Sequence, residues 1–273
     1  MLVVDCQVHI WGPDTPERPW PSVGTNVMHR FVPAESLVQE MKQAGVDRAV
    51  LVPPAFEGDR NDVVLAAVRK YPGRFGVMGR LALDRPESRE KIAGWRDTPG
   101  MLGIRQSFHT PEFRRMLASG GTDWFWPAAE AAGIPLYVFC PGLLDEMADI
   151  ARSHPALRIT FSHFSLATGA DVGELNTVAE KLQELAKYPN LAVTASALPC
   201  HASEPFPFPS LREPLRKVIE AFGANRVFWG SDLTRLPCTY KEVVDFGKGL
   251  DFLSPEELEQ VMGAGLMTWL RWE

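Results

Sequence analysis

Three residues of this sequence carry side chains suited to catalysis, and each stands at the end of a short apolar run. They are His9, His163 and Asp232. Imidazole and carboxylate groups transfer protons near neutral pH, and two histidines with one carboxylate can also bind a divalent metal ion. If the runs are strands of one sheet, their ends can bring the three groups together. The elements around them decide whether they meet.

The first apolar run, Leu2–Trp11 (LVVDCQVHIW), combines the pattern of a strand with polar side chains. Successive residues of a strand face opposite sides, which predicts that Asp5, Gln7 and His9 share one face. Buried polar groups cost free energy unless each has a hydrogen-bond partner. We therefore expect this face to meet the other two candidates, with the apolar side chains on the opposite face: Leu2, Val4, Cys6 and Val8.

Strand-like and helix-like stretches alternate along the whole chain. Runs rich in β-branched and apolar residues predict eight strands: Leu2–Trp11, Ala49–Val52, Phe75–Leu83, Met101–Ser107, Pro135–Cys140, Leu157–His163, Leu191–Ser196 and Arg226–Gly230. Helical spacing and end signals predict helices after most of them: Pro33–Gly45, Asn61–Lys70 with Asn61 as its cap, Pro86–Arg96, Asp123–Ala132, Leu143–Ser153, Val172–Lys187, Leu211–Phe222 and Pro255–Leu270 with a capping box of Ser254 and Glu257.

This alternation predicts one α/β domain over residues 1–273. Eight β-α units favour a closed (β/α)₈ TIM barrel over an open sheet, and no GxGxxG follows the first strand to support a dinucleotide-binding fold. Two long segments, Gly12–Pro33 and Leu198–Pro209, predict extended loops after strands one and seven. Loops of this length in a compact domain usually have a function.

In such a barrel the active site lies at the C-terminal ends of the strands. Two arginines there, Arg80 and Arg105, close otherwise apolar strands and can bind carboxylates through two hydrogen bonds; ion pairs inside the barrel are the alternative. Gln7 is a further candidate for substrate contact, with a hydrogen bond to Asp5 or His163 as the alternative, and Trp11 is a candidate for an aromatic wall. The residues predicted at the strand ends are Gln7, His9, Pro53, Arg80, Arg105, Gln106, Phe139, Cys140, His163, Thr194, Ser196 and Asp232.

The composition argues against several classes of protein. The chain of 273 residues is 45% hydrophobic and 23% charged, and its net charge of −6 argues against nucleic-acid binding. No apolar run approaches the roughly 20 residues that span a bilayer. The four cysteines are widely spaced without a CxxC pair, which favours a reduced, cytoplasmic protein. We expect a small carboxylated molecule as the partner and leave open whether the chain forms a homo-oligomer.

Three motifs resemble those of the amidohydrolase superfamily: DCQVHIW at the first strand, FSHF at the sixth and VFWGSDLTRL at the eighth. The resemblance covers nearly the whole chain. It is nearest to the amidohydrolase-related branch of lactonases and decarboxylases, which includes the 2-pyrone-4,6-dicarboxylate lactonases, and it implies a hydrolase on a TIM barrel. The family's full metal site uses His-x-His on strand one, a His on each of strands five and six, and an Asp on strand eight.

The chain matches this metal site only in part, which leaves two mechanisms open. In the first, His9, His163 and Asp232 bind one divalent ion, zinc or manganese, as in a metal-dependent decarboxylase or amidohydrolase. In the second, which we favour because Gln7 and Phe139-Cys140 replace two ligands, no metal is bound. Asp232 then acts as general base on water, while the histidines or the arginines stabilise the oxyanion.

The metal-free mechanism suits an activated ester better than an amide, and the lactonase branch that the chain resembles is associated with metal-independent hydrolysis. We therefore expect the chain to open a small carboxylated lactone or cyclic ester. A third alternative is a barrel without catalysis that binds a small molecule.

Overall fold

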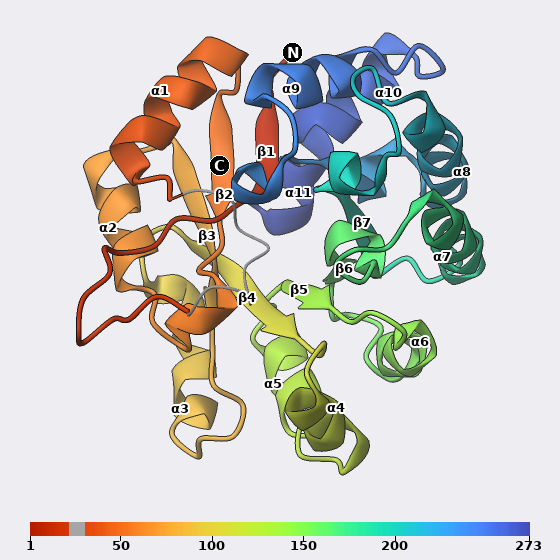
Figure 1. The fold of residues 1–273 in the computed structure, drawn as a ribbon. Coiled ribbons are helices and arrows are strands. Elements are labelled where there is room, and N and C mark those ends of the chain that lie inside the picture. The colour runs from red at the N-terminus through yellow and green to blue at the C-terminus, as the bar shows by residue number, and fades with distance from the viewer. Residues whose placement is uncertain (22–30) are drawn as a thin grey trace.

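The chain folds into a barrel of parallel strands surrounded by helices (Figure 1). The structure is a computed structural model that describes residues 1–21 and 31–273. The strands are hydrogen-bonded in their order along the chain, so each crossover runs to its neighbour, as in a TIM barrel. They are β1 (Val4–Val8), β2 (Arg48–Leu51), β3 (Phe75–Arg80), β4 (Met101–Ser107), β5 (Leu136–Phe139), β6 (Ile159–Phe161), β7 (Leu191–Ala195) and β8 (Val227–Trp229).

The helices lie outside the strands, and each predicted helix is present, with ends shifted by a few residues. Two further helices, α4 and α9, were not among the predicted ranges. The first follows Thr110, whose Oγ1 accepts a hydrogen bond from the amide of Phe113, and the second begins with a capping box of Thr239 and Glu242. The helices are α1 (Ala34–Ala44), α2 (Asp62–Lys70), α3 (Ser88–Ala93), α4 (Pro111–Ala118), α5 (Phe125–Ala131), α6 (Leu144–Ser153), α7 (Val172–Leu185), α8 (Arg212–Phe222), α9 (Tyr240–Lys248), α10 (Pro255–Glu259) and α11 (Gly265–Leu270).

The predicted last helix, Pro255–Leu270, is divided in two. Its capping box forms as expected between Ser254 and Glu257, but a wider turn, Gln260–Ala264, separates α10 from α11. At this turn the chain packs directly on the start of β1, since a Cβ on Gly263 would lie 2.7 Å from the carbonyl oxygen of Leu2. The close approach requires glycine there and gives α11 its own direction.

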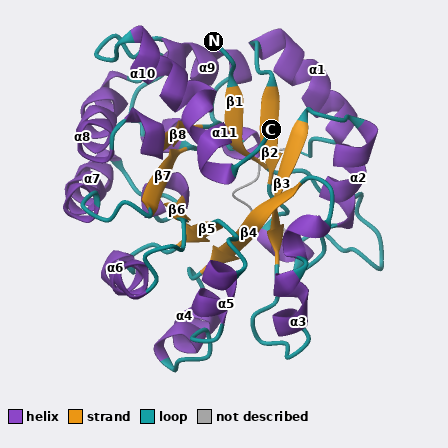
Figure 2. Cartoon of the chain, turned by 180° about the vertical axis from the view of Figure 1, so that it is seen from behind, coloured by secondary structure: helices purple, strands orange, loops and turns teal. Residues whose placement is uncertain are grey.

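Two apolar layers form the core. The outer layer lies between strands and helices. The inner layer fills the barrel, and α11 lies across one end of it (Figure 2). Trp269 of α11 donates its indole N–H to Thr160 Oγ1 on β6 (2.9 Å). The inner layer consists of Val4, Cys6, Val50, Val52, Met78, Leu102, Tyr137, Ala192, Phe228, Leu266 and Leu270.

Asp5 closes the barrel where β8 meets β1. Its carboxylate accepts hydrogen bonds from the Ser231 amide (2.9 Å), the Ser231 hydroxyl (2.5 Å) and the Tyr240 hydroxyl (2.7 Å). Burial raises the pKa of Asp5 to about 6, although these hydrogen bonds act in the opposite direction. A Cβ on Gly230 would lie only 2.4 Å from Cys6 Sγ, so the two strands approach too closely there for any larger residue.

The expected alternation along β1 is right for Gln7 and His9, whose side chains lie together, but wrong for Asp5 and Val8. Val4 and Cys6 pack in the inner layer, but Val8 packs in the outer one, and the Asp5 side chain bonds to α9 rather than to the side chain of Gln7. The register of β1 against β2 shifts between Asp5 and Val8. This irregularity is a β-bulge that adds one residue to β1, so the side chains after it point to the opposite side of the sheet from the one that strict alternation predicts.

Both predicted long loops are present in the part of the chain that can be described. The loop after β1 includes a small bridge between Thr15 and Arg18; much of Gly12–Pro33, including His29, lies outside the described residues. The loop after β7 contains two short 3₁₀ turns, Leu198–His201 and Pro209–Leu211. No helix within residues 1–21 and 31–273 has the length and apolarity to span a membrane.

Candidate active site

His9 follows β1 and is held by the next strand. Its Nδ1 lies 2.7 Å from the carbonyl oxygen of Val52, which can only accept, so Nδ1 carries the proton. Its Nε2 lies 3.3 Å from Oδ1 of Asp232. Burial lowers the pKa of His9 to about 4, against the attraction of Asp232. The imidazole is therefore neutral at pH 7, and its Nε2 is an acceptor.

His163 lies in the turn Ser162–Ser165 that ends β6, in a left-handed conformation (φ 54°). Its amide donates to Thr194 Oγ1 (2.9 Å), and its Nδ1 lies 2.9 Å from Ser196 Oγ. Burial holds the pKa of His163 well below its usual value. Two side chains of the neighbouring strand end thus orient this neutral ring, and its Nε2 lies 3.8 Å from Oδ2 of Asp232.

Asp232 follows β8 and is fully buried, also with a positive φ (54°). Its amide donates to the carbonyl oxygen of Gln7 (3.0 Å), which places it across the β8–β1 junction. Arg235 Nη1 lies 3.3 Å from Oδ2. Within the described part of the chain, Oδ1 has no hydrogen-bond partner. Burial opposes ionisation, but the positive charges of Arg235 and Arg105, and of either histidine when it is protonated, favour it, and the pKa of Asp232 lies below its usual value.

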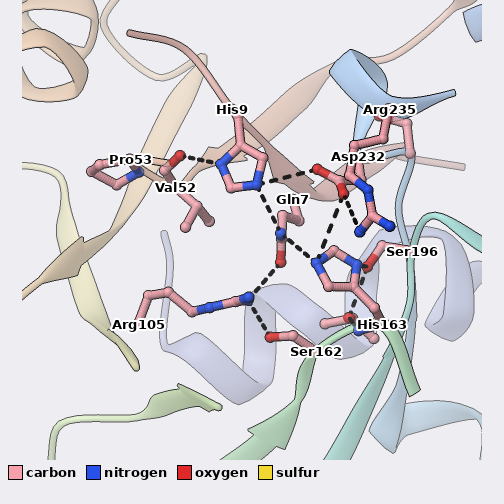
Figure 3. Close-up of polar contacts among 12 residues, drawn as sticks. Gln7, His9, Val52, Pro53, Arg105, Ser162, His163, Ser196, Asp232 and Arg235 are labelled. Carbon is pink, nitrogen blue, oxygen red and sulfur yellow. Dashed lines mark hydrogen bonds and ion pairs between the residues drawn. The ribbon is translucent and has the colours of Figure 1, made fainter. Parts of the chain in front are cut away.

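Gln7 lies at the centre of the site, between the two imidazoles (Figure 3). Its Oε1 accepts from Nη1 of Arg105 (3.0 Å). Its Nε2 lies 2.8 Å from Nε2 of His163 and 3.4 Å from Nε2 of His9. The structure therefore brings together all three residues that the sequence singled out, with Gln7 and Arg105 joined to them in one network.

Arg105 and Arg80 are neighbours at the ends of β4 and β3. Arg105 also donates to Ser162 Oγ (2.5 Å), and its guanidinium lies over the ring of Phe139 (5.6 Å). Burial, followed by the like charge of Arg105, lowers the pKa of Arg80 to about 9. A buried cation, Arg105, and a half-buried one, Arg80, repel each other and so provide an attractive position for an anion.

A cleft of about 220 Å³ opens beside the two arginines. Arg80 is positioned for it by Asn61, whose side chain bonds both the amide (2.8 Å) and the carbonyl (2.9 Å) of Arg80. The predicted capping role of Asn61 is wrong, because its side chain makes no cap hydrogen bond to α2. Besides the arginines, the cleft is lined by polar and aromatic side chains that include Asp59, Asp84, Gln106, Ser107, His109 and Phe113.

Trp11 lies in an aromatic cluster at the start of the first long loop. Its ring centroid is 6.3 Å from Trp20, 5.6 Å from Phe31 and 5.7 Å from Phe56. Trp11 itself is buried. Its contacts are those of loop packing, and its part in a substrate wall stays a prediction.

Arg235 and Ser162 belong to the network but were not selected from the sequence. Arg235 follows Asp232 by three residues, and it lies 3.3 Å from Oδ2 because a 3₁₀ turn, Leu233–Arg235, folds it back. Ser162 directly precedes His163. Both residues lie within three positions of a candidate in the sequence, and this nearness could have identified them. Asn61 lies 19 residues before Arg80, so nothing in the sequence indicated that it positions that arginine.

The donor set at the centre does not fit a metal ion as it is arranged. His9, His163 and Asp232 have the ligand chemistry for a divalent cation, and the unpartnered Oδ1 is an available ligand atom. However, the amide nitrogen of Gln7 lies against the Nε2 atoms of both rings, where such an ion needs their lone pairs. A group of three or more His, Cys, Asp or Glu side chains in metal-binding geometry is absent from the described residues.

The position of the expected strand-five ligand is apolar. Phe139 packs its ring against His163 (centroids 5.7 Å apart), and Cys140 lies 3.3 Å from Ser165 Oγ. Burial raises the pKa of the Cys140 thiol to about 12, so this thiol is protonated at neutral pH.

Known proteins resemble this chain over nearly its whole length. An L-fucono-1,5-lactonase from Burkholderia ambifaria is 27% identical over 292 residues, covering 98% of this chain and 95% of that protein. An amidohydrolase from Burkholderia multivorans, solved with bound zinc, has a TM-score of 0.81 at 19% identity over 99% of both chains. A protein from Acinetobacter baumannii, described as a probable 2-pyrone-4,6-dicarboxylic acid hydrolase and solved with citric acid, has a TM-score of 0.76 at 14% identity over 100% of both chains.

The TM-scores show that the two solved structures have the same fold as this chain. Their sequence identities, 19% and 14%, are too low to indicate a shared function. The sequence model of the amidohydrolase family matches residues 4–264, which include every residue of the polar network and of the cleft. The chain therefore belongs to the amidohydrolase family.

Proposed function

We propose that this hydrolase is a lactonase that opens a small carboxylated lactone by attack of water, with Asp232 as general base. The observation that carries the proposal is the state of Asp232: a buried carboxylate that is ionised at neutral pH and keeps Oδ1 free for a new hydrogen bond. A general base needs such an acceptor within reach of the water that it activates. The likeness to an L-fucono-1,5-lactonase supports a lactone as the substrate.

The reaction then proceeds in two steps. Water donates a hydrogen bond to Oδ1 of Asp232 and attacks the lactone carbonyl carbon, so that a C–O bond forms and the water proton passes to the carboxylate. The tetrahedral intermediate collapses, the ring C–O bond breaks, and the leaving alkoxide takes the proton from Asp232. The products are a carboxylic acid and a hydroxyl on one open chain, and Asp232 is again ionised.

Guanidinium groups are the donors best placed for the developing oxyanion. His9 and His163 present Nε2 atoms that accept, so in this tautomer neither ring donates a hydrogen bond towards the centre. Arg105 contributes a buried positive charge beside Gln7, and fixed charges in a dry site stabilise an oxyanion without reorganisation. Arg80, at the cleft, is then available for the carboxylate of the substrate.

Replacement of Asp232 tests this proposal. Asp232→Asn keeps the size of the side chain and removes the base, so kcat for lactone opening should fall at least about a hundredfold. The substrates are five- and six-membered lactones with and without a carboxylate, and the measurement is proton release in weak buffer. Asp149→Asn, a surface change on α6, is the control. Unchanged kcat in Asp232→Asn, or a wild-type chain that opens none of the lactones, would overturn the proposal.

A further inference from the structure

The side-chain amide of Gln7 has only one orientation that satisfies its neighbours. Arg105 carries hydrogen-bond donors and no acceptor, and its Nη1 lies 3.0 Å from Oε1 of Gln7. Arg105 is itself fixed by Ser162, to which the same nitrogen donates. If the amide turned over, its NH₂ group would face a guanidinium. Oε1 therefore faces Arg105, and Nε2 faces the histidines.

The amide nitrogen of Gln7 then donates a hydrogen bond to each of the two imidazoles. Nε2 of Gln7 carries two hydrogens, and it lies 2.8 Å from Nε2 of His163 and 3.4 Å from Nε2 of His9. Both ring atoms then accept from Gln7, and at His9 this contact competes with Oδ1 of Asp232, itself an acceptor, 3.3 Å from the same Nε2. The opposite ring nitrogens carry the protons, which agrees with the carbonyl of Val52 beside His9 and with Ser196 Oγ beside His163. Gln7 thus selects the same tautomer in both rings.

The same contacts exclude Gln7 as a metal ligand in this arrangement. Only Oε1 of an amide binds a cation, and that atom faces Arg105. A divalent ion held by His9, His163 and Asp232 would have to displace the Gln7 NH₂ group from two lone pairs. It would also place its charge close to the buried guanidinium of Arg105, which repels it.

We propose that the Gln7 amide takes the place of a metal ion in this barrel, holding His9 and His163 as neutral acceptors around Asp232, and that this one residue keeps the site from binding divalent cations. Gln7 is a positioning residue, because it acts through the two rings. Its contribution to hydrolysis rests on the proposed function, whereas the tautomers and the metal affinity do not.

Zinc binding by single variants of the whole chain tests the proposal. Gln7→Glu replaces the donor by an acceptor of the same shape, and Gln7→His adds an imidazole two residues before His9. Each should lower the Kd for zinc at least about tenfold relative to wild type, since changes even in the hydrogen-bond partners of metal ligands alter affinity about 10- to 100-fold. The matched control is Gln106→Glu, a change of the same kind at a buried glutamine that donates to Leu81 rather than to the imidazoles. The measurement is calorimetric titration with zinc, with bound metal counted after dialysis.

Nitrogen-15 NMR of the histidine rings gives a second, independent readout on the wild-type chain. Both His9 and His163 should show a protonated Nδ1 and an unprotonated Nε2 at pH 7, and Gln7→Leu should remove this pattern from His163. Tight stoichiometric zinc in the wild type, equal affinities in all variants, or Nε2-protonated rings would each overturn the proposal. If the wild type opens no lactone while these results hold, the proposed function fails and the role of Gln7 stands.

Discussion

Backbone strain is concentrated at the residues of the site. His163 (φ 54°), Ala197 (φ 59°) and Asp232 (φ 54°) follow three successive strands, and all adopt the left-handed conformation that residues with a Cβ avoid. Such a conformation costs of order 1–3 kcal/mol per residue and persists only where other contacts enforce it. Here the enforcing contacts are the amide hydrogen bonds of His163 to Thr194 and of Asp232 to Gln7. The candidate catalytic groups are therefore held in place by their neighbours rather than by local preference.

Arg80 offers the cleanest test of the expected carboxylate anchor. Unlike Arg105 it does not hold Gln7; its Nε donates to the carbonyl of Pro53, and the rest of its guanidinium is left for a substrate in the cleft. Arg80→Ala should raise KM for a carboxylated lactone about ten- to a hundredfold, the value of one charge-assisted hydrogen bond. KM for a neutral lactone should change less than about threefold.

The control for this measurement is Arg85→Ala, which removes a cation at the same cleft that is paired with Asp59. It should leave both KM values close to wild type. Equal effects of Arg80→Ala on carboxylated and neutral lactones would refute the anchor, and the preference for a carboxylated substrate would fall with it.

At the scale of elements, the barrel and its convergent residues could be predicted from patterns that repeat. Each strand is buried on both faces and reads as an apolar run, and Met101–Ser107 matches β4 residue for residue. Most strand ends could thus be located to within about three residues, the predicted Phe75–Leu83 ending three residues beyond β3, and this was close enough to predict the meeting of His9, His163 and Asp232. The irregular register of β1 could not be foreseen, because one added residue depends on its fit to β2 and β8. A hydrogen bond between Gln7 and His163 was one expected alternative, and it is present; the contact of Gln7 with Arg105 could not be foreseen, because it depends on how β4 is placed relative to β1.

Asp5 links the first strand, β1, to the residues that follow the last strand, β8. Its carboxyl group should make the folded chain less stable as the pH rises. Its pKa is about 6 in the folded chain against 3.8 for the ordinary group. Between these values the folded chain binds more protons than the unfolded one, so the contribution of Asp5 to stability is greatest below pH 3.8 and is lost as the pH rises through 6. The total change is about 3 kcal/mol.

Asp5→Asn isolates this effect, because the amide does not titrate and its hydroxyl partners can reverse their hydrogen bonds. The low pKa of His9 changes stability with pH in the opposite direction in both proteins, so it cancels in the difference. The free energy of unfolding of wild type minus that of Asp5→Asn should decrease from pH 4 to pH 7, as measured by urea denaturation. Parallel curves over this range would show that the carboxyl does not titrate as described.

At the scale of the whole molecule, the two ends of the barrel have different tasks. The C-terminal ends of the strands carry the polar network and the cleft. At the other end α11 lies across the barrel (Figure 2), and the inner apolar layer fills the barrel interior. Changes at the α11 end should therefore alter stability without altering the reaction.

Leu270 of α11 is the position to test this separation. It is fully buried in the inner layer, whose side chains pack below the polar network. Leu270→Ala should lower the free energy of unfolding by about 2–5 kcal/mol, the cost of deleting a buried leucine side chain and leaving a cavity. Leu2→Ala, at a leucine that is 37% exposed, should cost much less. At a temperature where both variants remain folded, kcat and KM for the lactone should equal those of the wild type. A large loss of kcat in folded Leu270→Ala would mean that the packing beneath the site positions Gln7 and the histidines as well as supporting the barrel.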